Sequence, residues 1–202
     1  MVRVPVTTGE PADWSDAELI SFDGLCDELE HIALRFRVPA GDAAEAPLLV
    51  RIHSECLTGD VFGSARCDCG PQLAEAVERI SGEGGVILYL RQEGRGIGLY
   101  NKIDAYQLQD CGLDTFAANR ELNFAEDERS YHVAAEMLAA LGIRRVRLLS
   151  NNPDKAEQLR SNGIEVDSIV PTGVFLNQSN QDYLRAKLDQ GGHTIQLQKE
   201  QP

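Results

Sequence analysis

Hydrophobic residues along the central part of the chain follow two spacings, one typical of strands and the other typical of helices. Short apolar or alternating runs predict strands over residues 31–38, 47–54, 85–92, 145–150 and 164–170. Apolar residues three and four positions apart predict helices over 72–80, 97–111, 130–141, 153–162 and 182–190. Glycines end several of these helices, among them Gly112 and Gly142. Strands interleaved with helices predict an α/β fold, a mixed sheet flanked by helices.

The two ends of the chain and one internal segment lack such a pattern. Residues 1–30 are predicted to form an irregular N-terminal segment with weak helical character over 17–30, and residues 191–202 a polar tail. Residues 112–129 show no period and are predicted to form a long connection, which in a compact domain usually serves a function. No repeat or linker divides the sequence, so we expect residues 1–202 to form a single domain without a fused second enzyme.

Length and composition are those of a soluble globular protein. The chain has 202 residues, of which 43% are hydrophobic and 25% charged, enough for a substantial core. No apolar run approaches the roughly 18 residues of a membrane span. The N-terminus has neither the cationic start nor the apolar centre of a signal peptide. We therefore expect a cytoplasmic protein that does not contact membranes.

The charge is strongly negative. With 19 Lys and Arg against 32 Asp and Glu, the net charge is −13. An overall negative field argues against general binding of nucleic acids or anionic membranes. It does not exclude a small anionic substrate, because a local cluster of Arg and Lys in a cleft can oppose the global sign.

Five cysteines occur in the chain. The odd number and the lack of a secretory signal argue against a disulfide framework. Cys26 and Cys111 lie in helix-like contexts and are predicted to be ordinary buried thiols. The other three, Cys56, Cys67 and Cys69, fall within fourteen residues and require a separate explanation.

These three cysteines favour a catalytic metal site. Three thiolates would supply three ligands to a tetrahedral zinc and leave one position for water, which zinc activates. His53 is the nearby candidate for a fourth ligand, but on a strand its side chain need not converge with that of Cys56. Buried structural cysteines or a redox pair are the alternatives.

The segment 92–98 (QEGRGIG) is a candidate anion-binding loop. It follows a predicted strand and opens a helix, where backbone N–H groups and the helix dipole attract anions. It is not a Walker A loop, because no Gly-Lys-Ser/Thr follows, and a simple strand-to-helix turn is the alternative. Arg91, Arg95 and Lys102 lie close to it in sequence and supply the local cations that an acidic chain requires.

Three other features each allow a structural and a functional interpretation. The charged run that contains Asp127 and Arg129 is either a solvated surface or an acid–base and phosphate-contacting pair. Tyr106 shares a helical face with Leu99 and Ile103, as a core tyrosine would. Residues 151–155 (NNPDK) follow a strand and open a helix, so they cap that helix and also offer a ligand loop.

Taken together, the motifs resemble those of the GTP cyclohydrolase II family of riboflavin synthesis. The resemblance covers about residues 30–190 and rests on RIHSECLTGDVFGSARCDCGPQL, LRQEGRGIGLYNKIDAYQLQD, FAEDER and SNNPDK. Their combination is far more specific than any single motif. It implies an enzyme that opens the imidazole ring of GTP and releases formate and pyrophosphate. It also implies one Zn²⁺ per chain, Mg²⁺ on the triphosphate and a homodimer.

The resemblance also implies roles for individual residues. The zinc ligands would be Cys56, Cys67 and Cys69. Asp127 would be the proton acceptor, and Arg129 would be the group treated in the family as the nucleophile toward the α-phosphorus, while Tyr106 would assist hydrolysis at the ring. The residues expected to contact GTP are Arg51, Ile52, His53, Ser54, Glu55, Gln72, Glu93, Gly94, Arg95, Thr115, Ser150 and Lys155.

A few positions depart from the family pattern. Ser150 replaces a usual Thr and keeps the hydroxyl, and Asp104 replaces a usual Arg. Asn123 replaces a usual Gly, and because both tolerate a positive φ the turn can persist. Two alternatives stay open: a homologue that opens the ring but keeps the formyl group for a secondary metabolite, and a non-catalytic nucleotide- or zinc-binding regulator.

Overall fold

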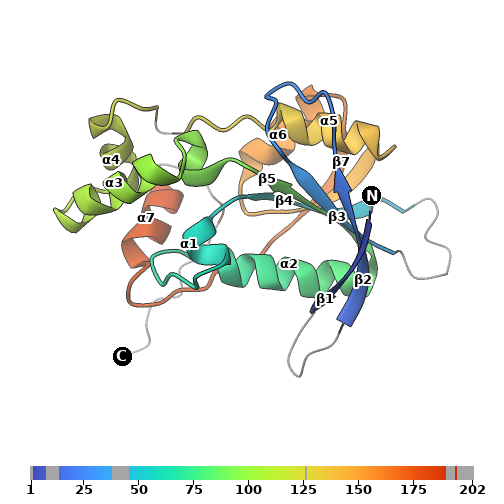
Figure 1. Ribbon diagram of the computed structural model, residues 1–202, viewed down its shortest axis with the longest axis horizontal. Helices are drawn as coiled ribbons and strands as arrows, with labels where there is room; N and C mark the ends of the chain where they lie inside the picture. The colour runs from blue at the N-terminus through green and yellow to red at the C-terminus, as the bar shows by residue number, and fades with distance from the viewer. Residues whose placement is uncertain (1, 8–13, 38–45, 126, 190–193, 195–202) are drawn as a thin grey trace.

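A seven-stranded mixed sheet forms the centre of the molecule (Figure 1). The computed structural model describes residues 2–7, 14–37, 46–125, 127–189 and 194. The strand order is β1-β2-β3-β5-β4-β6-β7; β1, β2, β3 and β5 pair antiparallel in that order, whereas β5, β4, β6 and β7 run parallel. The strands are β1 (Val2–Thr7), β2 (Trp14–Ser21), β3 (Ile32–Phe36), β4 (Leu48–Ser54), β5 (Gly85–Leu90), β6 (Arg145–Leu149) and β7 (Glu165–Val170). The predicted α/β fold with a mixed sheet is confirmed.

Helices cover both faces of the sheet and produce two hydrophobic clusters. Helix α2 (Cys69–Glu83) lies on one face, and α5 (His132–Ala140) and α6 (Pro153–Ser161) lie on the other (Figure 1). On β4, Leu49 packs in the cluster on the α2 side, whereas Val50 packs in the cluster that contains α5 and α6. Because side chains alternate along a strand, residues 51 and 53 share the α2 side with Leu49.

The functional motifs lie where the parallel strands end. Strands β4, β5 and β6 end at Ser54, Leu90 and Leu149, and the predicted site segments begin directly afterwards. Around that end of the molecule, at the left of Figure 1, lie α1 (Leu57–Asp60), the 3-10 turn η2 (Glu93–Gly96), α3 (Leu99–Asp110), α4 (Thr115–Glu121) and α7 (Gln181–Asp189). Ligands of open α/β sheets bind in this position, outside the carboxyl ends of the strands.

Local backbone chemistry agrees with the sequence at two predicted turns. The Asn152 side chain accepts a hydrogen bond from the backbone N–H of Asp154, and Pro153 occupies the first helical position of α6. The predicted capping role of residues 151–155 is therefore confirmed. Asn123 has a φ of 63°, so it adopts the left-handed conformation expected where the family has glycine.

Two predictions about the ends and connections of the fold are wrong. Residues 2–7 and 14–21 are not irregular, and residues 17–21 are not helical: β1 and β2 pair antiparallel and extend the sheet beyond β3. The connection over 112–129 contains helix α4, which is only seven residues long and therefore too short for a clear period. The predicted tail, 191–202, lies outside the described residues except for Thr194, whose backbone N–H donates to the Asn151 carbonyl.

The other two cysteines also differ from expectation. Cys26 and Cys111 are exposed, not buried, because Cys26 lies in the connection after β2 and Cys111 at the C-terminal end of α3.

Among the helices that the structure describes, none combines the length and the apolar character that crossing a membrane requires.

Candidate active site

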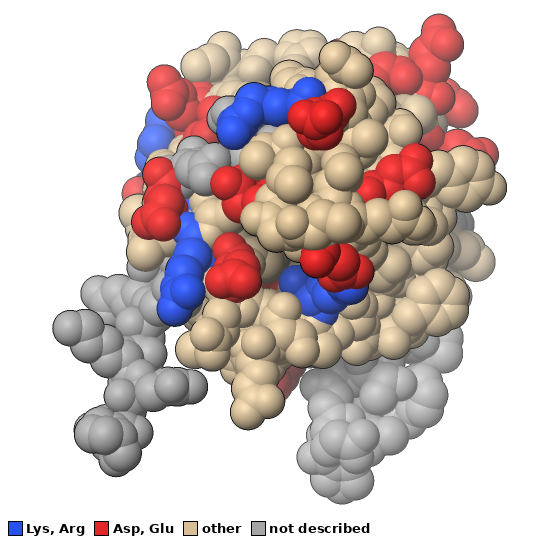
Figure 2. All heavy atoms as spheres, turned by 90° about the vertical axis from the view of Figure 1, so that its left-hand side faces the viewer, with Lys and Arg blue, Asp and Glu red and all other residues tan. Residues whose placement is uncertain are grey.

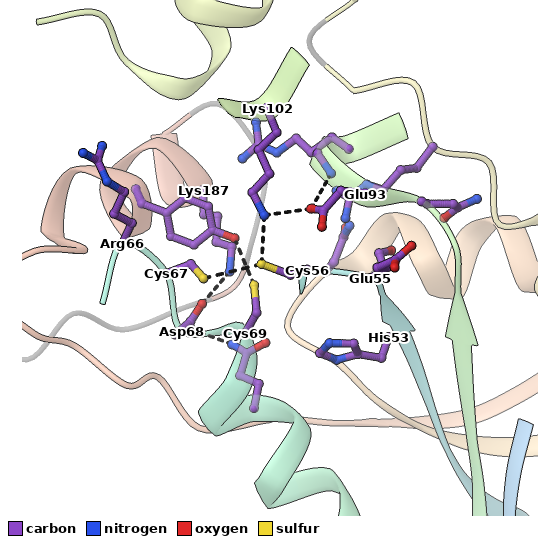
Figure 3. Close-up of a pocket in the computed structure, with 18 of the residues that line it drawn as sticks. His53, Glu55, Cys56, Arg66, Cys67, Asp68, Cys69, Glu93, Lys102 and Lys187 are labelled. Carbon is purple, nitrogen blue, oxygen red and sulfur yellow. Dashed lines mark hydrogen bonds and ion pairs between the residues drawn. The ribbon is translucent and has the colours of Figure 1, made fainter. Parts of the chain in front are cut away.

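Three cysteine sulfur atoms converge at the carboxyl end of β4. Cys56 follows that strand, Cys67 precedes α2, and Cys69 is the first residue of α2. Their sulfur atoms all lie within 4.8 Å of one another, and those of Cys56 and Cys67 are 3.7 Å apart (Figure 3). Zinc–sulfur bonds of about 2.3 Å in a tetrahedron place two sulfurs about 3.8 Å apart. The spacing and the donor chemistry therefore fit a zinc ion.

Two glycines make this convergence sterically feasible. A Cβ atom at Gly59 would lie 2.8 Å from the sulfur of Cys67 and 3.1 Å from that of Cys56. At Gly70 it would lie 2.4 Å from the Gly59 carbonyl oxygen. Helix α1 can approach the start of α2 because neither glycine carries a side chain. In the sequence these glycines lie in the same motif, RIHSECLTGDVFGSARCDCGPQL, as the cysteines.

His53 does not join the sulfur atoms. Its Nε2 lies 3.1 Å from both carboxylate oxygens of Asp60, which also accepts hydrogen bonds from the Cys56 backbone N–H and the Tyr89 hydroxyl. Burial lowers the pKa of His53, so its imidazole is neutral at neutral pH. With Nε2–H donating to Asp60, Nδ1 is left as an acceptor. His53 thus organises the loop that carries Cys56 and is not a fourth ligand of the cysteine cluster.

A pocket opens beside the sulfur atoms, and most predicted site residues line it. Those that do so, besides the three cysteines, are Arg51, His53, Ser54, Glu55, Gln72, Glu93, Gly94, Arg95, Tyr106, Arg129, Ser150 and Lys155. Ile52 differs, because its side chain packs in the hydrophobic core and its carbonyl accepts a hydrogen bond from Lys155 Nζ at 2.8 Å. Asp127 reaches the pocket through Arg129. Thr115 begins α4, but its side chain lies outside the described part of the chain.

Three cationic side chains in the pocket wall are buried, which disfavours their charged forms. Burial lowers the pKa of Arg51, Arg95 and Lys155, and the neighbouring charges of Arg51 and Arg129 lower that of Lys155 further. Enclosed positive charge is unfavourable unless an anion compensates it. On the outer surface of this end of the molecule, Lys and Arg are interspersed with Asp and Glu (Figure 2). The local positive patch that an acidic chain requires is therefore inside the pocket.

Asp127 and Arg129 form the close pair that the sequence suggested. The guanidinium donates to both carboxylate oxygens of Asp127, and the Arg129 backbone N–H donates to the same carboxylate. Burial works to raise the pKa of Asp127, but the hydrogen bonds and charge of Arg129 lower it. Burial also opposes the charge of Arg129, but Tyr131 and Asp127 outweigh it and raise the pKa of Arg129. Both groups are therefore ionised near neutral pH.

Several pocket-lining residues carry buried polar atoms that have no hydrogen-bond partner within the described structure. Three of these atoms are Nε of Arg51, Nδ1 of His53 and Oε1 of Gln92. Buried polar atoms are normally paired, so an unpaired set in a pocket wall indicates a polar ligand. One of these atoms is a donor and two are acceptors, which suits a ligand that presents both kinds of group.

The segment 92–98 adopts an unusual backbone that serves Glu93. Gly94 and Arg95 both have left-handed φ values, 64° and 63°. Glu93 accepts hydrogen bonds from the backbone N–H groups of Gly94 and Leu57, and from Lys102 Nζ at 2.7 Å. These hydrogen bonds connect the loop to α1 and orient Lys102, which a simple strand-to-helix turn would not require.

The cations near this segment are arranged differently from the prediction. Arg91 is exposed, pairs with Glu55 and does not line the pocket. Lys102 lines the pocket, but its ammonium lies 3.1 Å from the sulfur of Cys56 and pairs with Glu93. Of the three predicted cations Arg91, Arg95 and Lys102, Arg95 is the one that stays in the proposed phosphate-binding group, because it is buried and lines the pocket.

Tyr106 faces the pocket and not the core. Its hydroxyl lies 3.1 Å from Thr58 Oγ1, which in turn lies 3.7 Å from the sulfur of Cys56. Ile103, expected on the same buried face, is 44% exposed. The interpretation of Tyr106 as a core tyrosine is therefore wrong.

Helix α7 brings side chains to the site that sequence reasoning missed. Tyr183 has its hydroxyl 3.8 Å from the sulfur of Cys69. Lys187 donates to Asp68 at 2.8 Å, and Asp68 also accepts a hydrogen bond from Gln72, which itself accepts one from Arg51. The i, i+4 spacing of Tyr183 and Lys187 places them on one helical face, but nothing in the sequence indicates which surface that face covers.

A second group of ligand-type side chains lies on the surface. Cys26, His132 and Glu136 have donor atoms within 4.8 Å of one another. The carboxylate of Glu136 already accepts a hydrogen bond from the Cys26 backbone N–H and lies 3.4 Å from His132. Unlike the three cysteines of the sulfur cluster, none of these three residues lines the pocket described here.

Comparisons with known proteins agree with this geometry. The family model for GTP cyclohydrolase II matches residues 4–171. A GTP cyclohydrolase-2 of Vibrio cholerae is 53% identical over 90% of this chain and 91% of its own, and one of Psychromonas ingrahamii is 55% identical over 90% of each chain. A riboflavin biosynthesis protein of Bacillus cytotoxicus is 47% identical over 93% of this chain and 47% of its own. The chain belongs to the GTP cyclohydrolase II family.

Proposed function

We propose that this protein is a zinc-dependent GTP cyclohydrolase II. It hydrolyses GTP to 2,5-diamino-6-(5-phospho-ribosylamino)pyrimidin-4(3H)-one, formate and diphosphate, the first step of riboflavin synthesis. The observation that carries the proposal is the position of three converging cysteines in the wall of a pocket that also encloses cations. Family membership supports the same reaction.

The unpaired polar atoms of the pocket wall indicate where the guanine base would bind. Guanine presents two N–H donor groups and the acceptors O6 and N7. Arg51 Nε can donate to an acceptor of the base, while His53 Nδ1 and Gln92 Oε1 can accept from its donors. These residues lie on β4 and directly after β5, next to the strand end that carries Cys56. The base would therefore be held with its reacting ring toward the cysteines.

The cysteines would hold the metal, and Tyr106 would act beside it. Zinc bound by Cys56, Cys67 and Cys69 would supply a Lewis acid that lowers the pKa of water toward about 7. Tyr106, whose hydroxyl contacts Thr58, would donate a hydrogen bond to the formamide that remains after ring opening. This assistance favours complete release of formate over a homologue that keeps the formyl group.

The cations would hold the triphosphate together with Mg²⁺. Lys155 and Arg95 carry enclosed positive charge that a polyanion would compensate. Arg129 would act at the α-phosphorus, and Asp127, which is paired with its guanidinium, would accept a proton there. The ionised pair also suits the charge that develops on phosphoryl oxygens.

We further infer a cytoplasmic homodimer. Free cysteines, rather than disulfides, are typical of a reducing compartment. Phe62, which follows α1, and Tyr100, on α3, are 74% and 82% exposed, which is unusual for large aromatic side chains on a monomer. Analytical ultracentrifugation of the wild type and of a Phe62→Ser, Tyr100→Ser double variant would test this state.

The reaction itself is tested by mass analysis of products from the purified zinc-loaded protein with GTP. We expect formate, pyrophosphate and the diaminopyrimidinone in equal amounts. A formylated pyrimidine as the final product would support the homologue that serves a secondary metabolite. Unchanged GTP, with nucleotide and zinc both bound, would support a regulator and refute the proposed enzyme.

A further inference from the structure

Two side chains from outside the cysteine motifs contact two of the three sulfur atoms. The ammonium of Lys102, on α3, lies 3.1 Å from the sulfur of Cys56, and Figure 3 shows it pointing at that atom. The hydroxyl of Tyr183, on α7, lies 3.8 Å from the sulfur of Cys69. Both are hydrogen-bond donors, and neither is among the residues to which a ligand or catalytic role was assigned above.

The charge of the cysteine cluster explains why such donors matter. A zinc ion of charge +2 bound by three thiolates leaves a net charge of −1. Catalytic zinc sites built from three neutral imidazoles keep the full positive charge and are therefore stronger Lewis acids. Hydrogen bonds to ligating groups tune a metal, because they withdraw electron density from the ligands. A three-thiolate site that activates water needs this compensation most.

We infer that Lys102 and Tyr183 are positioning residues that tune the cysteine metal site. Lys102 offsets the surplus negative charge through Cys56, and Tyr183 withdraws density from Cys69. This inference rests on the proposed zinc site. It assigns the lysine of the segment LYNKI a function at the metal instead of at the phosphates.

The loop before α3 is built to hold Lys102 in place. The Glu93 carboxylate accepts a hydrogen bond from the Lys102 ammonium at 2.7 Å. It also accepts hydrogen bonds from the backbone N–H groups of Gly94 and Leu57, which hold it in place. A Cβ atom at Gly94 would lie 3.1 Å from Cβ of Lys102, so the close approach of the loop to α3 requires glycine there. Both charged side chains are largely enclosed, which strengthens their electrostatic effect on the sulfur.

Tyr183 is fixed from the opposite side by the packing of α7. Leu184 is fully buried, and Lys187 ties the helix to Asp68, the residue between two of the cysteines. The ammonium of Lys187 also lies 4.4 Å from the centre of the Tyr183 ring. The phenol is therefore held over Cys69 by contacts on the same helix face.

Cobalt substitution of the full-length protein tests the inference with a spectroscopic readout. Co²⁺ bound by thiolates shows a sulfur-to-metal charge-transfer band, whose energy falls when the sulfurs lose hydrogen-bond donors. We expect Lys102→Met to shift this band clearly to longer wavelength, Tyr183→Phe to shift it less, and Lys102→Arg to restore most of the wild-type position. Arg91→Met is the matched control, because Arg91 is a nearby cation that pairs with Glu55 instead of a cysteine.

Kinetics of the zinc-loaded variants give the second readout. Lys102→Met should lower kcat for formate release about 10- to 100-fold with little change in KM, as loss of an outer-shell partner does. A phosphate-binding role would instead raise KM and leave the cobalt band unchanged, and that result would overturn the inference. If wild type binds Co²⁺ without any thiolate band, the proposed metal site fails and the inference with it. If Lys102→Met does not fold, the Tyr183→Phe and Lys102→Arg bands still decide the question.

Discussion

Two sets of side chains in the pocket wall differ in charge, in origin and in energetic cost. The sulfur set comes from one short stretch of sequence and is brought together by two glycines. The cation set comes from four separate segments: β4 carries Arg51, the turn η2 carries Arg95, the loop before α5 carries Arg129 and α6 carries Lys155. The first is compact and offers three sulfur ligands, whereas the second encloses positive charge at a cost to the fold. The difference supports the division of chemistry that we propose, with ring hydrolysis at the sulfur set and phosphate chemistry at the cation set.

Cys67→Ser should break the sulfur set and have the largest effect. In the proposed zinc site Cys67 is one of three ligands, so its loss should remove bound zinc and abolish formate release. Metal analysis and a formate assay would measure both. Cys111→Ser is the control, because Cys111 is exposed and outside the cluster. A Cys67→Ser protein that keeps one zinc and full formate release would contradict the assignment.

Arg129→Ala should break the cation set at its reactive member. Its guanidinium is paired with Asp127 and faces the pocket, so we expect pyrophosphate release to fall by at least about 100-fold in kcat while zinc stays bound. A change in KM alone would show that Arg129 only binds GTP. Arg145→Ala, which removes an exposed arginine that pairs with Glu165 and Asp167, is the matched control.

Tyr106→Met should divide the chemistry within the sulfur set itself. In the mechanism that we propose, ring opening does not need the phenol, whereas hydrolysis of the formamide gains about 10²- to 10⁴-fold from such positioned acid–base assistance. We expect a formylated pyrimidine to accumulate, detectable by mass spectrometry, while zinc remains bound. Tyr89→Phe is a control for loss of a hydroxyl that bonds Asp60 instead of Thr58. Formate release at the wild-type rate by Tyr106→Met would remove Tyr106 from the mechanism.

Lys155→Met should have the smallest effect on catalysis. It should weaken GTP binding but raise the free energy of unfolding. Burial and neighbouring cations depress the pKa of Lys155 in the folded state, so its charge costs stability below that pKa. This cost declines as pH rises from the folded pKa toward the unfolded value of about 10.4. At neutral pH the variant should therefore gain about 1 kcal/mol in free energy of unfolding while GTP binds more weakly. Denaturant unfolding and calorimetry with GTP would measure the two changes.

Lys155 also predicts how binding depends on pH. GTP favours the ammonium form, so wild-type affinity should decline as pH rises through the lowered pKa of free Lys155. Binding between the free and bound pKa values should take up protons, and Lys155→Met should lack this component. Equal pH dependence in the two proteins would show that Lys155 does not meet the nucleotide.

The same contrast explains what the sequence could predict. Strands β4, β5 and β6 are rich in buried apolar residues, so their ends and the motifs after them could be placed from the pattern alone. The sulfur cluster is local in sequence, and the prediction of a metal site there followed from three cysteines and a missing fourth ligand. The capping of α6 by Asn152 and the positive φ of Asn123 followed from residue chemistry.

What the sequence did not predict depends on contacts between distant segments. Strands β1 and β2 extend the sheet at its edge, where weaker burial leaves a polar pattern that resembles an irregular segment. Lys102 was predicted among phosphate-binding cations because its neighbour in sequence is a glycine-rich loop, but the turn of α3 directs it to Cys56. The approach of α7 to Cys69 has no local signal, since only tertiary packing determines what an amphipathic face covers.

The division of chemistry between the two sets is tested most directly by removing the metal from the wild-type protein. Chelated protein is assayed with GTP for formate and pyrophosphate separately, and then again after one equivalent of Zn²⁺ is returned in the presence of Mg²⁺. We predict that formate release is lost without zinc and restored by it, while GTP still binds through the cation set. Full formate release by the metal-free protein would contradict the account.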